Sequence, residues 1–579
     1  MAKDDTEEVI STSARQRLGQ RLVARPDLGA VGVATVFWAV SLFPTLLPRA
    51  NLIQGGLTGV SAMVGYGVGG LGLLAWRAVA RRAGWPSPPA SARRVGRVVL
   101  GIAWLVLLSG GSWLWWHWQN VQRDLVGMPL ISWRSAFNVI LIALVLCVVL
   151  LAVSRLIAGG LGWIFSSLRP RIGGAGARVA VGVVAIVVAA LAGKVLIVDG
   201  VYASTDATFK AGDNGTDPGV HQPTSSLDSG GPGSLTPWGT LGLQGRTFAG
   251  GAVSKKHLAQ FAGPGVPVTQ PIRVYAGLKS APTAEARAAL AVRELERTGA
   301  FDRPVLVVAT ATGTGWVDPS AASAIEYMWH GNSAIVSIQY SYLPSWIAFL
   351  TETAAAADAG RALQDAVAAK WRQLPADHRP RLVLFGQSLG SQGSDNAMAK
   401  ADLPTSMDSV FAHGQSVLYT GPTGSNEIWH QLLAARTPTS PIWRPVEPTA
   451  PALFANSYAE IGGATTTPVK RIQYVQHASD PVTWWSMDVA WWPPEWITGP
   501  HGPDTMGQMI WFPFVTWLQT SADLIAGFSA SVGHGHNYTD AFAGGFTSVA
   551  APPGWTKADT KSLAELLTIL NAIGSDVGS

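Results

Sequence analysis

The sequence has very little cysteine: a single residue, Cys147, among 579. One thiol cannot form a disulfide within the chain, and it cannot supply the thiolate sets that structural zinc sites and iron–sulfur clusters need. Charge is also scarce, since Asp, Glu, Lys and Arg make up only 13% of the residues. Together with a mean hydropathy of +0.23, this scarcity indicates a chain that is part membrane and part water-soluble.

The charges that are present are unevenly distributed. Residues 1–198 carry 19 Lys and Arg against 6 Asp and Glu, whereas the remainder carries 22 against 30. The basic excess therefore belongs to the first third of the chain, and the rest is mildly acidic. Nucleic-acid binding is a poor explanation of the net charge of +5, and no nucleic-acid partner is expected.

Five apolar stretches in the first third, each close to the roughly 20 residues that span a bilayer, predict a helical membrane domain over residues 30–198. They lie at about 30–48, 52–76, 98–118, 136–157 and 179–198. The second is rich in glycine and so a weaker helix former, and a re-entrant or interfacial segment is the alternative there. None of the five contains Asp or Glu, which transport pathways usually need, so the domain is expected to be an anchor or platform.

Basic residues predict the orientation of these helices. The segment before the first stretch and the second and fourth connections together hold 15 Lys and Arg, against 3 in the first and third connections. By the positive-inside rule, the N-terminal segment 1–29 is expected in the cytoplasm of a multi-pass plasma-membrane protein. With five spans, everything after residue 198 is then extracytoplasmic. Residues 199–240, rich in Gly, Ser, Thr, Asp and Pro, are expected to be an extracytoplasmic linker.

Residues 241–579 are expected to form an α/β domain with a mostly parallel sheet. Apolar strands alternate with helical patterns: strands at 272–278, 304–309, 334–340, 381–385 and 471–477, and helices at 283–298, 319–330 and 350–374. Continuous apolar strands between helices are typical of a parallel sheet covered on both faces. Such sheets carry their sites at the carboxyl ends of the strands.

A Gly-x-Ser-x-Gly motif at 386–390 stands at one such end. The strand at 381–385 runs directly into it, and a helix-compatible segment at 391–401 follows. This context predicts a nucleophile elbow, in which small flanking residues allow a strained turn that exposes the Ser388 hydroxyl. The alternative is a plain glycine-rich turn. A related string at 414–416 lacks the second glycine and is interpreted as a strand-end turn.

A nucleophilic serine needs a base and an orienting acid, which in such sheets follow in the order Ser, Asp or Glu, His. Asp480 directly follows the late strand and is the expected acid, although it could instead only cap a short helix. His536 lies in a glycine-rich loop and is the expected base, because Asn537 and Tyr538 after it can anchor the loop. His534, in the same loop, is the alternative base.

The oxyanion that forms during acyl transfer needs N–H donors. Leu389, the residue after the serine, is the first expected donor, and Thr312 in the small-residue loop 310–315 is the second. That loop lacks the Gly-x-x-x-x-Gly-Lys-Ser/Thr pattern of a phosphate-binding loop. His534 and His536 have no cluster of Cys, Asp or Glu beside them, so no metal site is expected. No cofactor is expected either.

The segment between Asp480 and His536 contains seven tryptophans and is predicted to be an aromatic-rich cap insertion. Aromatic residues at this density suit a cap over the site, a membrane-facing surface or a sugar-stacking platform. Packing within the insertion is the simpler explanation for most of them.

Several segments together resemble one known family. They are RVYAGL (273–278), RELERTGAFDRPVLVVATATGTGW (293–316), IQYSYLPSW (338–346) and FGQSLGSQGS (385–394), with the multi-span N-terminal region. The family is a bacterial, mainly actinobacterial, group of membrane-anchored alpha/beta-hydrolases with a separate N-terminal membrane domain. The resemblance implies an alpha/beta-hydrolase fold and a serine-hydrolase active site, and it implies no definite substrate. The family usually has Glu before the nucleophile, where this chain has Gln387.

The residues and the resemblance lead to one expectation: a membrane-anchored extracytoplasmic serine esterase or lipase-like enzyme that uses Ser388, His536 and Asp480. Its substrate is expected to be an acyl ester of a cell-envelope lipid or glycolipid, argued from location and tryptophan content. An acyltransferase that uses the same residues is the alternative. A non-catalytic envelope assembly scaffold is the alternative of a different class. The oligomeric state is not predicted.

Overall fold

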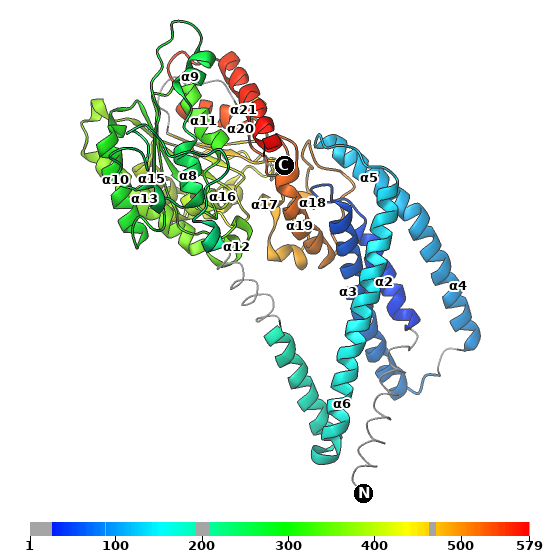
Figure 1. Cartoon of the computed structure of the whole chain (residues 1–579). Helices are drawn as coiled ribbons and strands as arrows, with labels where there is room; N and C mark the ends of the chain where they lie inside the picture. Colours follow the sequence, from blue (N-terminus) through cyan, green and yellow to red (C-terminus); the bar gives the residue numbers. More distant parts are fainter. Residues whose placement is uncertain (1–25, 87–88, 193–208, 462–469, 578–579) are drawn as a thin grey trace. The chain divides into compact units, whose positions relative to one another are not determined.

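The computed structural model describes residues 26–86, 89–192, 209–461 and 470–577 (Figure 1). The chain divides into two compact units. The first unit holds the chain up to Ala203 together with Met487–Pro493 and Met506–Ala526, and the second unit holds the remainder. Two pieces of the expected cap insertion therefore fold with the N-terminal helices.

The first unit is helical. Its N-terminal part consists of α2 (Leu28–Ser41), α3 (Asn51–Arg82), α4 (Ala90–Val106), the π-helical turn η1 (Leu107–Gly111), α5 (Ser112–Leu125) and α6 (Arg134–Ala192). Later in the chain it gains η7 (Met487–Ala490) and α19 (Val515–Ala526). Three described segments are long and apolar enough to span a membrane: Asn51–Arg82, Ala90–Leu125 and Arg134–Pro170. The expected count of about five spans is not supported.

Two of the expected spans differ from the prediction. The run at 30–48 becomes the 14-residue helix α2 followed by an irregular segment, because Pro44 and Pro48 do not allow a helix to continue. The run at 179–198 lies partly outside the described residues, and its described part is the end of α6. The helical geometry of α6 is interrupted at Gly173, whose φ is 74°.

The glycine-rich helix α3 is continuous, and four of its eight glycines face neighbouring helices at close range. A Cβ atom placed on Gly55 would lie 2.7 Å from Ile142 of α6, and one placed on Gly65 would lie 2.7 Å from Phe37 of α2. A second glycine in close contact follows four residues after each of them. This is the spacing of small residues that lets membrane helices pack closely, so the glycines that weaken the isolated helix stabilise it in place.

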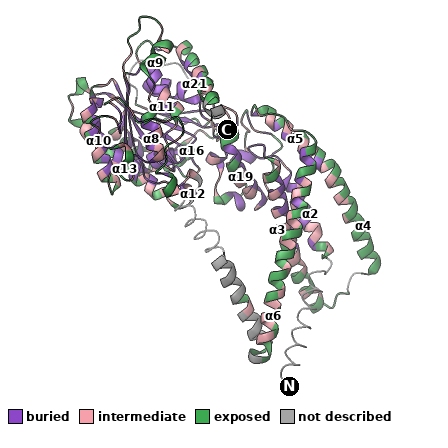
Figure 2. Cartoon of the chain, viewed as in Figure 1, coloured by how far each residue is buried: buried purple, intermediate pink, exposed green. Residues whose placement is uncertain are grey.

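Large apolar side chains are exposed along α4 and α6 (Figure 2). Val98, Ile102 and Leu105 on α4 are more than half exposed, and so are Phe137 and Val148 on α6. Water-soluble proteins rarely expose contiguous apolar surface of this extent, so these helix faces fit a lipid environment.

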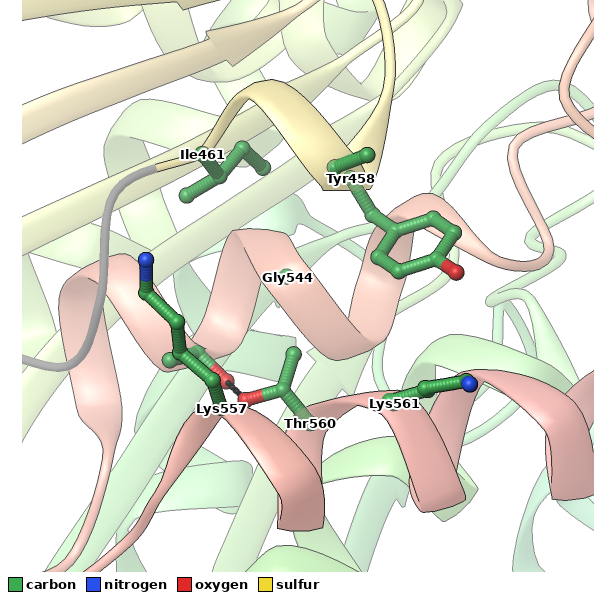
Figure 3. A pocket seen from close by; sticks show the side chains of 8 residues that line it. Tyr458, Ile461, Gly544, Lys557, Thr560 and Lys561 are labelled. Atoms are coloured by element: carbon green, nitrogen blue, oxygen red, sulfur yellow. Dashed lines mark hydrogen bonds between the residues drawn. The ribbon is translucent and has the colours of Figure 1, made fainter.

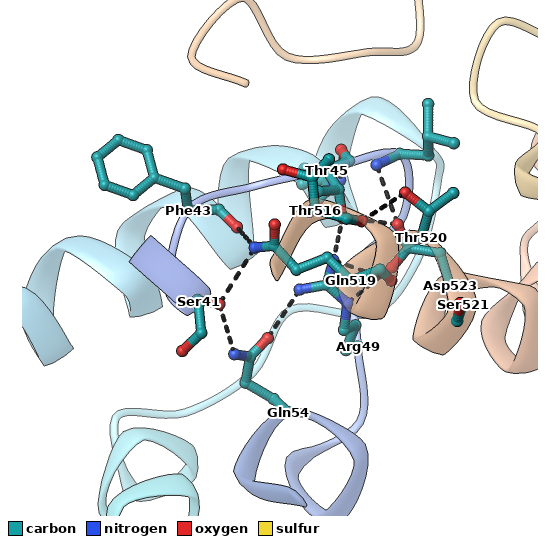
Figure 4. Close-up of polar contacts among 12 residues, drawn as sticks. Ser41, Phe43, Thr45, Arg49, Gln54, Thr516, Gln519, Thr520, Ser521 and Asp523 are labelled. Atoms are coloured by element: carbon teal, nitrogen blue, oxygen red, sulfur yellow. Dashed lines mark hydrogen bonds and ion pairs between the residues drawn. The ribbon is translucent and has the colours of Figure 1, made fainter. Parts of the chain in front are cut away.

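One polar cluster lies buried in the first unit, at the segment between α2 and α3 (Figure 4). Arg49 donates from Nε to Oδ1 of Asp523 at 2.7 Å, and both side chains are almost wholly buried. Thr45 donates to Oδ2 of the same carboxylate at 2.6 Å. The Gln519 amide donates to the Phe43 carbonyl at 3.0 Å. Because Gln519 and Asp523 belong to α19, this helix supplies hydrogen-bond partners to the irregular segment that the prolines create.

The second unit is built on a seven-stranded parallel sheet, as expected. Its strands are β1 (Ile272–Ala276), β2 (Val305–Thr310), β3 (Ala334–Ile338), β4 (Arg381–Gln387), β5 (Ser416–Thr420), β6 (Ala452–Ala455) and β7 (Arg471–Val475). The strand order is β1-β3-β2-β4-β5-β7-β6. Strands β5 and β6 are additions to the prediction. The string at 414–416, interpreted as a strand-end turn, leads into β5.

Helices pack around this sheet in two groups (Figure 1). One group is α10 (Ala284–Thr298), α13 (Thr353–Gln373) and α14 (Leu389–Met398), and the other is α11 (Pro319–Met328), α20 (Ala541–Ala550) and α21 (Lys557–Val577). The unit also contains α8 (Gly242–Gly250), α9 (Lys255–Ala262), α12 (Ser345–Thr351), α15 (Leu403–His413), α16 (Glu427–Ala435), α17 (Pro481–Trp484) and α18 (Glu495–Thr498). With almost every strand residue buried, the sheet is covered on both faces.

Residues 209–240, the described part of the expected linker, belong to the second unit and in part pair with the edge strand β1. Asp228 forms a parallel bridge with Arg273, and the Ser229 N–H donates to the Arg273 carbonyl at 2.9 Å. The Ser229 hydroxyl accepts from the Tyr275 N–H at 2.8 Å. A Gly- and Ser-rich composition occurs both in flexible linkers and in irregular segments that hydrogen-bond to a sheet edge, so composition alone does not separate the two.

Candidate active site

The turn between β4 and α14 has the geometry of a nucleophile elbow. Ser388 adopts φ 53° and ψ −128°, a strained conformation for a residue with a side chain. A Cβ atom on Gly386 would lie 2.5 Å from the carbonyl oxygen of Gly390, and one on Gly390 would overlap the Thr310 carbonyl. Both glycines of the motif are therefore required by close backbone approach, and the serine is placed at the carboxyl edge of the sheet.

Asp480 and His536 form a buried pair at the end of β7. His536 Nδ1 lies 2.7 Å from Asp480 Oδ2, and neither side chain is exposed. The same carboxylate accepts from the Val482 N–H at 2.8 Å, so Asp480 also caps α17. Asp480 therefore caps a helix and also contacts the His536 ring, and its role as the acid stays a prediction. With Nδ1 on the carboxylate, Nε2 of His536 is the ring atom left for a proton from the serine.

The end of β5 brings the serine and the histidine to one place. The Ser388 N–H donates to the Thr420 carbonyl at 3.0 Å. A Cβ atom on the next residue, Gly421, would lie 2.7 Å from Cε1 of His536. His536 Nε2 is buried and has no hydrogen-bond partner within the described residues, so the Ser388–His536 bond is not formed in this conformation. Such bonds often tighten only when substrate is bound.

Tyr538 is a further member of the site, and the sequence indicated it only as a loop anchor. Its hydroxyl donates to Asp480 Oδ2 at 2.8 Å and accepts from the His477 N–H at 3.0 Å. Burial raises the pKa of this hydroxyl, with the Asp480 charge acting in the same direction, so the group stays protonated and can donate. The ring also stands edge-on to His536, with centroids 5.7 Å apart. Asn537 makes the other expected loop bond, from Nδ2 to the Ala530 carbonyl at 3.2 Å.

His534, the alternative base, has a different partner. Its Nδ1 lies 3.2 Å from Oδ2 of Asp504 and not on Asp480. His477, at the end of β7, places Nδ1 2.8 Å from the Gly535 carbonyl. Burial lowers the pKa of His477, which favours a neutral ring that holds the loop. Asp480 is therefore the partner of His536, whereas His534 pairs with a different carboxylate, Asp504.

The two expected oxyanion donors differ in how free they are. Leu389 is the first residue of α14, and the first N–H groups of a helix have no partner within it. The Thr312 N–H, in contrast, donates to the Trp316 carbonyl at 3.0 Å. Its hydroxyl lies 3.3 Å from that of Ser345. This geometry favours Leu389 and does not favour the Thr312 N–H, whose role stays a prediction.

A second carboxylate, Asp318, lies near Gln387 and His536 and was not expected from the sequence. It caps α11 by accepting from the Ser320 N–H at 2.8 Å. Burial raises the pKa of Asp318 to about 6, against the opposing effect of hydrogen bonds that include one from the Gln387 side chain. The residue before Ser388 is therefore tied to Asp318. The signal available was the Asp-Pro pair at 318–319, which is typical of a helix start.

The seven tryptophans of the insertion do not share one environment. Trp484 and Trp496 are buried, whereas Trp491 and Trp492 are 64% and 70% exposed. Packing accounts for the first pair, as expected for most of the seven. The exposed pair belongs to Met487–Pro493, in the same unit as the apolar helices.

A small cavity of about 160 Å³ lies elsewhere in the second unit, among η6 (Tyr458–Glu460), α20 and α21 (Figure 3). Its lining residues are Tyr458, Ala459, Ile461, Gly544, Thr547, Lys557, Thr560 and Lys561. None of the residues expected in the active site is among them. Within the described ranges, no group of three or more His, Cys, Asp or Glu is arranged to hold a metal ion.

Comparison with known proteins gives a consistent result. A family model described as "Alpha/beta-hydrolase family" matches residues 272–563, about half of the chain. A model described as the N-terminus of an alpha/beta-hydrolase family matches residues 42–252. No curated protein matches. A solved acetylxylan esterase is 14% identical, with 31% of this chain and 85% of that chain covered and a TM-score of 0.20; a likeness this distant says nothing about the substrate.

Proposed function

The chain belongs to the alpha/beta-hydrolase family, and from this premise we propose that it is a membrane-anchored extracytoplasmic serine hydrolase of acyl esters. The observation that carries the proposal is the buried Asp480–His536 pair at 2.7 Å. Nε2 of His536, which has no hydrogen-bond partner among the residues that the structure describes, lies at the same strand end as the strained Ser388. A plain structural histidine would not need both a buried carboxylate on one ring nitrogen and an unpartnered nitrogen on the other.

In the proposed reaction, His536 Nε2 takes the hydroxyl proton of Ser388 as Oγ attacks the carbonyl carbon of the ester. Asp480 holds the opposite N–H of the ring and stabilises the imidazolium that forms. The Leu389 N–H donates to the oxyanion. His536 then gives its proton to the leaving alcohol. A water that His536 deprotonates hydrolyses the acyl-enzyme and restores the serine.

The location in the proposal rests on the first unit. Three described helices are long and apolar enough to span a membrane. The proposal takes the expected run at 179–198, which lies partly outside the described residues, as the crossing that returns the chain to the outer side. The basic residues Arg81 and Arg82 lie at the carboxyl end of α3. Arg49, which precedes the amino end of α3, pairs with Asp523 of α19. A segment from between the acid and the base is therefore attached at the end of α3 away from the basic cluster. By the positive-inside rule this favours an extracytoplasmic catalytic domain.

The substrate class is argued from this location. An acyl ester of a cell-envelope lipid or glycolipid would be within reach of a membrane-anchored hydrolase, and the exposed Trp491 and Trp492 suit a lipid–water interface. If a lipid or sugar hydroxyl replaces water in the second step, the same residues perform acyl transfer. Mass spectrometry of the acyl group trapped on Ser388, with and without added alcohol acceptors, separates the two reactions.

The test of the catalytic proposal is a set of variants of the full chain, assayed with a p-nitrophenyl ester and a fluorophosphonate probe. Ser388→Ala should abolish labelling and turnover, and His536→Ala should lower kcat by about 10³ or more. His534→Ala is the matched control in the same loop and should cost much less. Undiminished labelling of the Ser388 variant would refute the proposal. A dead Ser388 variant whose envelope phenotype is normal would favour the scaffold instead.

The orientation has its own test. In a chain whose single cysteine has been replaced, a cysteine at position 225 should react with an impermeant thiol reagent in intact cells. One at position 88 should not. The reverse labelling would refute the extracytoplasmic placement while leaving the chemistry of the site untouched.

A further inference from the structure

A second acidic cluster lies next to the proposed catalytic pair and is not used by the reaction. It consists of Asp504, Ser479 and His534, and we refer to it as the Asp504 cluster. Asp504 comes from the segment after α18, outside both the loop that carries the acid and the loop that carries the base. Its side chain is 4% exposed, so its contacts are made away from water.

Asp504 bonds to both loops with one oxygen. Its Oδ2 accepts from the Ser479 hydroxyl at 2.5 Å and lies 3.2 Å from Nδ1 of His534. The Ser479 hydroxyl in turn accepts from the Gly535 N–H at 2.9 Å. The acid loop and the base loop are thus joined through Ser479, and Asp504 fixes the direction of the Ser479 hydroxyl by accepting its hydrogen bond.

The Ser479–Gly535 bond joins the two residues that directly precede the proposed acid and base. Ser479 is the residue before Asp480, and Gly535 is the residue before His536. The Ser479–Gly535 bond therefore runs beside the Asp480–His536 bond, one residue away in each loop. A change in the spacing of the first pair moves the second. The distance between the proposed acid and base is accordingly set in part by a group that belongs to neither loop.

The surroundings of Asp504 favour its ionised form, which the bond from Ser479 requires. Burial alone would raise the pKa of Asp504, but the hydrogen bonds from His534 and from the Ser479 hydroxyl help to outweigh it, and the pKa lies below its usual value. An ionised carboxylate accepts and never donates, so the Ser479 proton has one direction in which to point. The oxygen of Ser479 then faces Gly535.

We propose that Asp504, acting through Ser479, is a positioning residue that holds the base loop against the acid loop and so fixes the Asp480–His536 geometry. This rests on the proposed function. His534 is then a partner of Asp504 and not a second base. An error of about 1 Å in the position of a catalytic group can cost about 10² in rate, which sets the size of the effect to look for.

The experiment measures kcat and KM of the full chain on a p-nitrophenyl ester, with active sites counted by fluorophosphonate titration. Ser479→Ala removes both bonds of the link and should lower kcat per titrated site by about 10- to 100-fold, with KM within about twofold. Asp504→Asn keeps an acceptor for the hydroxyl but loses the charge, so its kcat should fall by a smaller factor. Counting sites removes unfolded protein from the comparison.

The matched control is Glu326→Gln, in the same unit. Glu326 is wholly buried and pairs with Arg273 of the edge strand β1 at 2.6 Å, and it contacts neither loop. Its loss should lower thermal stability and leave kcat per titrated site unchanged. Equal falls in kcat for Glu326→Gln and Ser479→Ala would refute the proposal, because general destabilisation would then explain both.

The remaining outcomes of the experiment also test the proposal. If Ser479→Ala retains kcat per site within about twofold of the parent, the link does not position the pair. If Ser479→Ala cannot be purified folded, Asp504→Asn decides alone, and a parental kcat for it refutes the proposal. A parent chain that neither reacts with the phosphonate nor hydrolyses the ester would refute the proposed function itself, which is a different result from an active parent with unaffected variants.

Discussion

The buried Arg49–Asp523 pair gives a sharp prediction about what holds the first unit together. Nε of Arg49 donates to Oδ1 of Asp523 at 2.7 Å, and the two side chains are 1% and 0% exposed. Arg49 also donates from Nη1 to the Gln54 side chain at 2.9 Å. The perturbation is a double-mutant cycle on this pair (Figure 4), with the variants Arg49→Met, Asp523→Leu and the two together. Met and Leu are chosen because they are uncharged and similar in volume to the residues they replace.

The magnitude follows from burial. Removing one partner leaves the other as an uncompensated buried charge, at a cost of about 3–5 kcal/mol. Asp523→Leu also takes the acceptor from the Thr45 hydroxyl at 2.6 Å and the Leu46 N–H at 3.2 Å, at about 1 kcal/mol or more each. The double variant has no unpaired charge, so it should be more stable than the sum of the single effects implies, by about 2–3 kcal/mol.

The assay is thermal unfolding of the full chain in detergent. A loss of about 3–5 kcal/mol corresponds to a fall in Tm of roughly 6–20 °C for a domain of 150–250 residues. The control is the Asp27–Arg77 pair of the same unit, which has the same 2.7 Å separation but is 51% exposed on both sides. Arg77→Met should change Tm little, since exposed pairs contribute about 0–1 kcal/mol.

Two results would refute this reasoning. If Arg49→Met lowers Tm no more than Arg77→Met, burial of the pair contributes nothing. If the double variant falls by the sum of the two single falls, the residues stabilise the unit separately and the ion pair is not what couples α19 to the segment between α2 and α3.

Three further predictions concern the second unit. Tyr538→Phe removes the hydroxyl that donates to Asp480 and should lower kcat by about tenfold with KM unchanged, as steady-state kinetics would reveal. Gly390→Ala places a Cβ atom against the Thr310 carbonyl and should give a chain that is destabilised and unreactive with fluorophosphonate. Burial raises the pKa of Asp228 to about 7. The folded state therefore binds this proton more tightly than the unfolded state, and the resulting stability is full below about pH 4 and lost as the pH rises through about 7. Asp228→Asn should flatten that pH dependence of Tm.

Much of the sheet could be predicted, because its strands are continuous apolar runs flanked by helical patterns. The strands expected at 304–309 and 381–385 correspond to β2 and β4. The strands β5 and β6 have 5 and 4 residues and lie among short irregular segments. A buried strand of this length cannot be told from other apolar segments by periodicity alone. The equally short β1 and β3 stand next to predicted helices, whereas no helix was predicted beside β5 or β6.

The expected span at 30–48 differs from the structure for a local reason. Window composition treats the run at 30–48 as one apolar stretch, but Pro44 and Pro48 divide it, and α2 ends at Ser41. The glycines of α3 made a helix at the second run less certain than it is in the structure, where α3 is continuous. They weaken an isolated helix, yet in the folded unit they are the contacts through which α2 and α6 approach. Proline positions decide the first case, and helix packing, which sequence windows do not contain, decides the second.

Some residues of the candidate site could be predicted from the sequence and others could not. Ser388, Asp480 and His536 could be proposed because motif, strand end and chain order each restrict the choice. Asp504 could not, since its bonds run to Ser479 and His534, 25 and 30 residues away. No local pattern marks a buried carboxylate whose partners lie on two other loops.

Arg49 shows how such a distant partner changes the interpretation of a residue. In the sequence it counts as one of the few basic residues in a connection between spans, and so as weak evidence on orientation. In the folded unit it is buried on Asp523, 474 residues later. Arg49 is therefore a structural residue that joins the segment before α3 to α19, whereas Arg77 and Arg81 beyond the middle of α3 are exposed. The positive-inside rule counts Lys and Arg and is not a net-charge rule, so the ion pair leaves the count of 15 against 3 unchanged. The ion pair instead explains why a basic residue stands in a connection that is expected to hold few of them.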